Sequence, residues 1–186
     1  MHNFIFIVAF LGLSYSLNGL AETQVHHQSH HDHENHSTES DQTHSAHEHG
    51  IARLFVAVEQ QNLEIEFQSP AINLIGFEHK ATSETELVII QKTQALLNKP
   101  HSIFGIQKSS ECQPLQNHID MGQENSSDHS DIKAHYRFQC STISGLSLLK
   151  LFELFPAIES IDAQWVTEDH QKAQKITASE PHIVLE

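Results

Sequence analysis

A histidine-rich tract near the amino terminus limits what this 186-residue chain can fold into. Between positions 26 and 49 the sequence alternates histidines, carboxylates and small polar residues, without any Lys or Arg. Such a segment has no apolar face to bury, so we expect residues 22–49 to be disordered without metal. The folded domain is therefore expected in residues 50–186. The nine histidines of the tract are His26, His27, His30, His31, His33, His36, His44, His47 and His49.

The side chains of this tract predict metal binding. Neutral imidazole is the commonest protein ligand for Zn²⁺, and carboxylate oxygen is a competent co-ligand. No positive side chain in the tract repels a cation. A purification tag or a solvated linker is the alternative, but the histidines are irregularly spaced and interleaved with acids. We therefore predict several exchangeable Zn²⁺ sites here.

The rest of the composition and the amino terminus restrict partners and location. A formal net charge of −14 without a basic cluster argues against nucleic acid and against anionic membrane surfaces. Residues 1–21 have the pattern of a signal peptide. The apolar run at 4–13 is too short to span a bilayer, and small residues precede a predicted cleavage point after Ala21. An uncleaved anchor is the alternative. We expect cleavage to leave no membrane span and to release a periplasmic protein.

Export bears on the two cysteines, Cys112 and Cys140. In an oxidising compartment a disulfide is the default for such a pair. It would close a loop of about 29 residues, for which chain entropy predicts a stabilisation of roughly 3–4 kcal/mol. Zinc ligation by the cysteines is the alternative, although the sequence has no CxxC pair.

Hydrophobic patterning predicts an α+β fold built from two ββα-like halves with a mainly antiparallel sheet. In the first half, strands at 53–59 and 63–67 are followed by a loop at 73–79 and a helix. Ser83 and Glu86 form the capping box of that helix, with Leu87, Ile90 and Leu97 as its apolar stripe. In the second half we expect strands at 112–119 and 132–140, a buried helix at 146–155, and strands at 161–166 and 182–185.

Several segments, taken in order, resemble one known family. They are the signal peptide, a histidine-rich segment ending HEHG, SPAINLIGFEH, Cys112, YRFQC ending at Cys140, LFELFP and AQWVT. This order is similar to that of the ZrgA family of periplasmic zinc-uptake proteins, from His47 to Leu185. The resemblance implies an α+β zinc-binding protein that assists Zn²⁺ import by a metal transporter. Its partner would be an importer component, either an ABC transporter or the binding protein of one.

Within the folded part the candidate metal ligands are Glu78, His79, His129 and His135. Glu78 and His79 share a loop, whereas His135 lies on the polar face of a strand near His129. His49 immediately precedes the first strand and could join either group. Each of these histidines has an ordinary alternative, as a solvated side chain or one bonded to backbone. The remaining histidines of the domain, His101, His118, His170 and His182, are expected to be ordinary surface residues.

Two other functions compete with zinc uptake. An enzyme is not expected, because the sequence lacks HExxH, GxSxG and P-loop motifs and a flexible tract cannot orient a substrate. Periplasmic buffering or detoxification of copper or nickel stays open, because imidazole also suits Cu²⁺ and Ni²⁺. Expression under zinc starvation, compared with copper excess, would separate the two.

Overall fold

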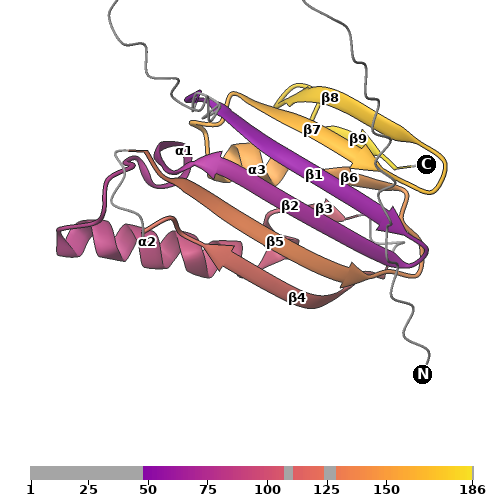
Figure 1. Cartoon of the computed structure of the whole chain (residues 1–186), viewed down its shortest axis with the longest axis horizontal. Helices are drawn as coiled ribbons and strands as arrows, with labels where there is room; N and C mark the ends of the chain where they lie inside the picture. Colours follow the sequence, from indigo (N-terminus) through magenta and orange to yellow (C-terminus); the bar gives the residue numbers. More distant parts are fainter. Residues whose placement is uncertain (1–47, 107–110, 124–128, 186) are drawn as a thin grey trace, which may run out of the picture. The chain divides into compact units, whose positions relative to one another are not determined.

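The computed structural model describes residues 48–106, 111–123 and 129–185 (Figure 1). The predicted signal peptide and every tract histidine except His49 lie outside these residues. Those predictions therefore stay predictions. No helix of the described part is long and apolar enough to cross a membrane.

A six-stranded sheet forms the main body of the domain (Figure 1). Its order is β4-β5-β2-β1-β7-β8, and every neighbouring pair is antiparallel except β1 with β7. The prediction of a mainly antiparallel sheet is confirmed. The strands are β1 (Ile51–Glu59), β2 (Asn62–Pro70), β4 (Gln113–Asp120), β5 (Asp131–Gln139), β7 (Ser160–Val166) and β8 (Gln171–Thr177).

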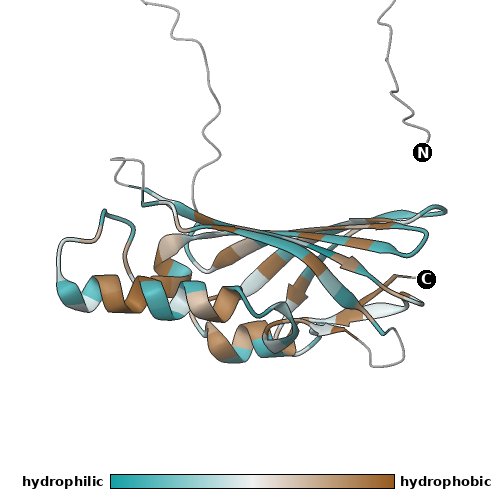
Figure 2. Cartoon of the chain, turned by 90° about the horizontal axis from the view of Figure 1, so that it is seen from below, coloured by the Kyte–Doolittle hydropathy of each residue, from teal (hydrophilic) through white to brown (hydrophobic). Residues whose placement is uncertain are grey.

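Helices and a small second sheet cover one side of the large sheet. Figure 2 shows the described helices along one side and none along the other. The helices are α1 (Ala71–Ile75), α2 (Glu84–Leu97), α3 (Leu149–Leu154) and the 3-10 turn η1 (Pro100–Ser102). The small sheet joins β3 (Gly105–Ile106), β6 (Gly145–Ser147) and β9 (His182–Val184) in the order β3-β6-β9.

The core lies between the large sheet and this cover. Alternate residues of each strand point to one side, so the apolar residues of β2 (Leu63, Ile65 and Phe67) lie beside their buried partners on β5. Burying each such large side chain stabilises the fold by about 1.5–3 kcal/mol. Tyr136 belongs to this layer, where its hydroxyl donates to the Leu97 carbonyl at 2.9 Å and burial raises its pKa.

The other side of the large sheet carries polar side chains and faces away from the core. We call it the open face. Its residues include Arg53 and Phe55 of β1, Glu64 and Glu66 of β2, and Lys133, His135 and Arg137 of β5.

Helix α2 begins where the capping box predicts. The Ser83 hydroxyl accepts a hydrogen bond from the Glu86 backbone N–H at 3.2 Å, and the Glu86 carboxylate accepts from the Ser83 N–H at 3.0 Å. The buried stripe consists of Ile90, Thr93 and Leu97. Leu87 is 49% exposed, so its predicted place in that stripe is wrong.

The second half departs from the sequence prediction. Both ββα units occur in chain order, and their four long strands belong to one sheet, which agrees with the prediction. The departure concerns the segment after β5. The helix predicted at 146–155 is limited to α3, because residues 145–147 pair with β3 and β9 instead. As a strand, residues 145–147 also supply hydrogen-bond partners to the backbones of β3 and β9, which a helix there would not do. This tertiary pairing outweighs helix propensity. Strands β3 and β8 and helix α1 were not predicted.

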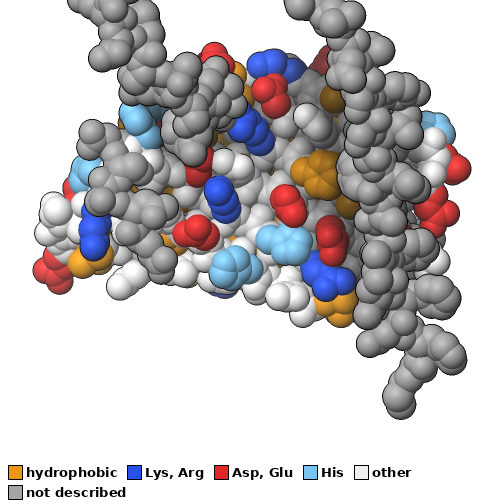
Figure 3. Space-filling model, viewed as in Figure 1, with side chains coloured by type: hydrophobic (Ala, Val, Ile, Leu, Met, Phe, Trp, Pro, Cys, Tyr) orange, Lys and Arg blue, Asp and Glu red, His pale blue; other side chains and the backbone are white. Residues whose placement is uncertain are grey.

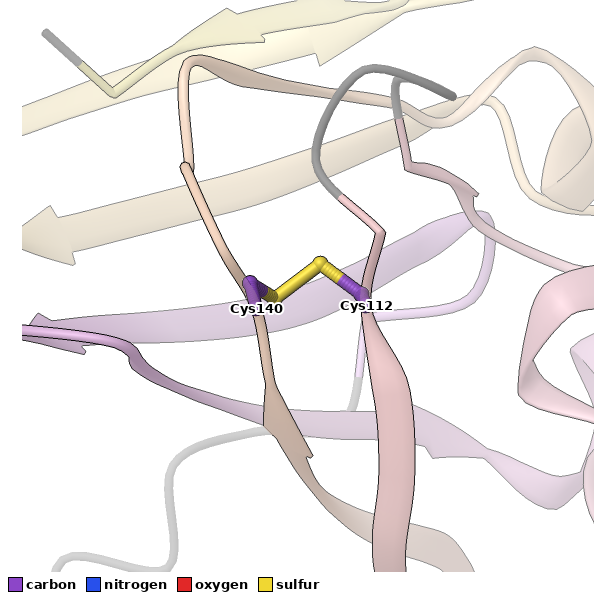
Figure 4. Close-up of a disulfide and its surroundings, with 2 residues drawn as sticks. All are labelled: Cys112 and Cys140. Carbon is purple, nitrogen blue, oxygen red and sulfur yellow. A yellow bond between two sulfur atoms is a disulfide. The ribbon is translucent and has the colours of Figure 1, made fainter.

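Cys112 and Cys140 form a disulfide, as predicted (Figure 4). Cys112 directly precedes β4 and Cys140 directly follows β5. The bond therefore joins the two strands at the end of their ladder, next to the pair Gln113 and Gln139. Neither sulfur remains as a thiolate ligand for zinc.

Candidate metal centre

Three predicted ligands come together from segments far apart in sequence. His49 lies two residues before β1, Glu78 lies between α1 and α2, and His129 lies two residues before β5. The His129 Nδ1 lies 2.8 Å from Oε2 of Glu78, and the His49 Nε2 lies 3.4 Å from Oε1. We call this group the Glu78 cluster.

Helix α1 holds the chain beside His49. The Gly50 N–H donates to Oδ1 of buried Asn73 at 2.9 Å, and the Asn73 amide donates to the Ile51 carbonyl at 3.3 Å. Gly50 has a φ of +83°, a conformation that side-chain-bearing residues adopt only with strain. Glycine in the HEHG motif therefore allows the turn that places His49 at the start of the sheet.

The segment carrying His129 is tied to the same place. The Ser130 hydroxyl donates to the Glu78 carbonyl at 2.8 Å, and the Ala71 N–H donates to the Ser130 carbonyl at 2.8 Å. Ser130 is itself buried. These bonds fix the backbone of Glu78 and of residue 130 together, so His129 stays within reach of the carboxylate.

Burial differs sharply within the cluster. The Glu78 side chain is 8% exposed, whereas those of His49 and His129 are 57% and 63% exposed. Oε1 of Glu78 is buried and makes no hydrogen bond within the described residues. Leaving a buried carboxylate oxygen unsatisfied costs free energy, and a cation placed there would recover it. Two imidazoles and one carboxylate also match the donors that Zn²⁺ prefers.

These donors do not already surround a common point. In residues 48–106, 111–123 and 129–185, no group of three or more His, Cys, Asp or Glu side chains forms a ready metal site. Each imidazole contacts a different oxygen of Glu78. An entering ion would have to replace these two contacts, and the exposure of both rings leaves them room to turn.

His79 lies with a different carboxylate. Its Nε2 is 3.0 Å from Oε1 of Glu86, and its ring centre is 5.0 Å from that of Phe77. Backbone hydrogen bonds from Thr82 and Ser83, and then the contact with His79, lower the pKa of Glu86 to about 2. His79 is thus paired with an acid that stays ionised, and the structure does not bring it into the Glu78 cluster.

His135 lies on the open face, also outside the Glu78 cluster. Its Nε2 is 4.0 Å from Oε2 of Glu64, whose other oxygen is 2.8 Å from Nε of Arg137. The strand partner of His135 on β4 is His118, which the sequence led us to treat as an ordinary surface residue. Only the register of β4 against β5 reveals that pairing.

Comparison with known proteins identifies the family. A family model described as ZrgA family zinc uptake protein matches residues 46–185. The chain belongs to the ZrgA family. No curated protein sequence matches it. The resemblance seen in the sequence is therefore confirmed over the folded domain, and the ZrgA family is one of zinc uptake proteins, not of enzymes.

The ZrgA match includes all members of the Glu78 cluster. It begins at residue 46, so it also contains His47, whereas His26, His27, His30, His31, His33, His36 and His44 precede it. The part common to the ZrgA family is thus the folded domain with the last histidines of the tract.

Proposed function

We propose that this ZrgA family member captures Zn²⁺ in the periplasm and assists its import by a metal transporter. The observation that carries the proposal is the buried Glu78 carboxylate between the exposed rings of His49 and His129. In this proposal the three side chains bind one ion. The histidine-rich tract supplies further, weaker sites.

The exposure of the two imidazoles supports exchange of the ion. Three protein donors leave one position of a tetrahedral zinc ion open. A donor from a transporter component, or an imidazole of the tract, occupies that position while the ion is handed over. The buried carboxylate supplies negative charge in a poorly solvated place, where its attraction for a cation is stronger than in water.

The location in the periplasm is supported by two features. The Cys112–Cys140 disulfide is of the kind that persists in oxidising compartments. Residues 1–21 have the pattern of an export signal.

The zinc dependence of unfolding tests the proposed site in the full chain. Tract ligands are neighbours in sequence and bind metal in the unfolded chain too, whereas the Glu78 cluster exists only after folding, so it dominates the stabilisation by zinc. Glu78→Gln combined with His129→Gln should reduce the rise in melting temperature that Zn²⁺ produces. His170→Gln combined with His182→Gln is the matched control, because both of these histidines are exposed. An unchanged rise in the first variant would contradict the site.

Growth in chelated medium tests the role in uptake. Cells carrying Glu78→Gln with His129→Gln should grow more slowly than cells carrying the control pair, and added zinc should restore them. Restoration by copper instead of zinc would overturn the uptake proposal in favour of copper buffering.

A further inference from the structure

A groove of about 500 Å³ crosses the open face of the large sheet. Figure 3 views this face and shows histidine side chains beside acidic and basic ones. The groove is bordered by strands β4, β5, β2, β1 and β7, and its lining includes His118, His135, Glu66, Lys133, Arg53 and Phe55. None of these residues belongs to the Glu78 cluster.

Strand register sets His118, His135 and Glu66 in one row. His118 of β4 is the direct partner of His135 on β5, and His135 is the direct partner of Glu66 on β2. Direct partners in antiparallel strands point to the same face with Cβ atoms about 4.5–5.5 Å apart. Two imidazoles and a carboxylate from three adjacent strands therefore project into one groove.

From this row we infer a second metal site, in which His118 and His135 bind a Zn²⁺ ion with Glu66 as the carboxylate ligand. Strands fix the positions of ligands better than loops do. Two nitrogens and one oxygen suit Zn²⁺ and leave one coordination position open toward the groove. The inference goes beyond the proposed function and does not depend on the Glu78 cluster.

The charges around His118, His135 and Glu66 determine how tightly this site binds zinc. Glu64, with Oε2 at 4.0 Å from His135, adds negative charge, but Arg137 pairs with its other oxygen. Lys133 lies on β5, two positions from His135, and Arg53 lies on β1, the strand next to β2; both side chains line the same groove. Their positive charge weakens attraction for a bare cation. This site is accordingly weaker than the Glu78 cluster and exchanges its ion readily.

Binding requires only turns of exposed side chains. The described donors are not already gathered around one point, as at the Glu78 cluster. Glu66 and His118 are exposed and His135 is partly exposed, so their rotamers can change without disturbing the core. The backbone positions that bring them together are already fixed by the β4–β5 and β5–β2 ladders.

The experiment is zinc-dependent unfolding of the full chain at pH 7.5, with Zn²⁺ as the probe. An ion that binds only the folded state multiplies the folded-to-unfolded ratio by about a hundredfold at 100 times its dissociation constant. His118→Gln with His135→Gln should abolish the increase in the folded-to-unfolded ratio that this one site produces at high zinc. Without zinc, the stability of the variant should be nearly that of the wild type. The control pair His170→Gln with His182→Gln should keep the full zinc effect.

Protection from diethyl pyrocarbonate locates the ion. Zinc should reduce modification of His118 and His135, measured on separate peptides by mass spectrometry, in the wild type and equally in Glu78→Gln. Retained protection in Glu78→Gln supports a second site even if the Glu78 cluster itself binds no zinc. Absence of protection at both histidines, or a full zinc effect in His118→Gln with His135→Gln, would overturn the inference while leaving the Glu78 proposal standing.

Discussion

Glu86 shows how one carboxylate connects a helix start to a predicted ligand. It accepts hydrogen bonds from the backbone N–H groups of Thr82 and Ser83 and contacts His79. These bonds favour its ionised form and lower its pKa from the ordinary 4.5 to about 2. A carboxyl group with a lowered pKa in the folded state stabilises that state above its unfolded pKa.

We expect this stabilisation to be lost as the pH falls from about 4.5 to about 2. Glu86→Gln should therefore destabilise the protein at pH 7. The difference in stability between variant and wild type should shrink toward zero as the pH approaches about 2. The measurement is the urea midpoint of both proteins at several pH values. Glu84→Gln is the control, because Glu84 lies in the same helical turn. A difference that is independent of pH would contradict the prediction.

Asn73 is the residue that links α1 to the Glu78 cluster. Its buried side-chain amide accepts a hydrogen bond from the Gly50 N–H and donates to the Ile51 carbonyl and the Ser69 hydroxyl. Asn73→Ala would leave the Gly50 N–H unpaired, which costs about 1–3 kcal/mol of unfolding free energy. Because Gly50 follows His49, we also expect a smaller zinc-dependent rise in melting temperature. Lower stability with an undiminished zinc effect would show that Asn73 does not position His49.

At the scale of elements, the disulfide secures the β4–β5 ladder. Both cysteines are buried and lie just outside the paired strands. Replacing them together, Cys112→Ser with Cys140→Ser, should lower the unfolding free energy by about 2–5 kcal/mol. Urea unfolding of wild type and variant measures this change. Thiol titration of the unfolded, unreduced wild type should find no free thiol, and two free thiols would contradict the bond.

The same variant separates the disulfide from metal binding. Neither cysteine belongs to the Glu78 cluster or to the row on the open face. Zinc should therefore still stabilise the double serine variant when it is folded. Loss of the zinc effect in the folded variant would show that the bond also supports one of these sites.

At the scale of the whole molecule, the histidine-rich tract and the folded domain are expected to bind zinc in different ways. Four donors complete a tetrahedral zinc ion, so nine imidazoles and several acids can serve more than one ion. Calorimetry on a chain lacking residues 22–48 should show fewer bound ions than the whole mature chain. Unchanged stoichiometry would contradict zinc binding by the tract.

The sequence alone determined several of the local elements of this protein. Alternation of apolar and polar residues predicted the β1–β2 hairpin, because a strand exposes successive side chains to opposite faces. The capping box predicted the start of α2, since both of its hydrogen bonds join residues three positions apart. Donor chemistry and motif order also indicated the zinc uptake family whose model matches residues 46–185.

Only the tertiary structure decided which donors meet. Glu78 and His79 are neighbours in sequence, yet one lies with His49 and His129 and the other with Glu86. The face of the sheet on which His118 lies depends on a single irregularity in β4. Without the register shift between Pro114 and Gln116, the pairing of Gln113 with Gln139 would set His118 opposite Ala134, on the core face. The bulge moves His118 opposite His135 on the open face, because a one-residue slip exchanges the two faces of a strand.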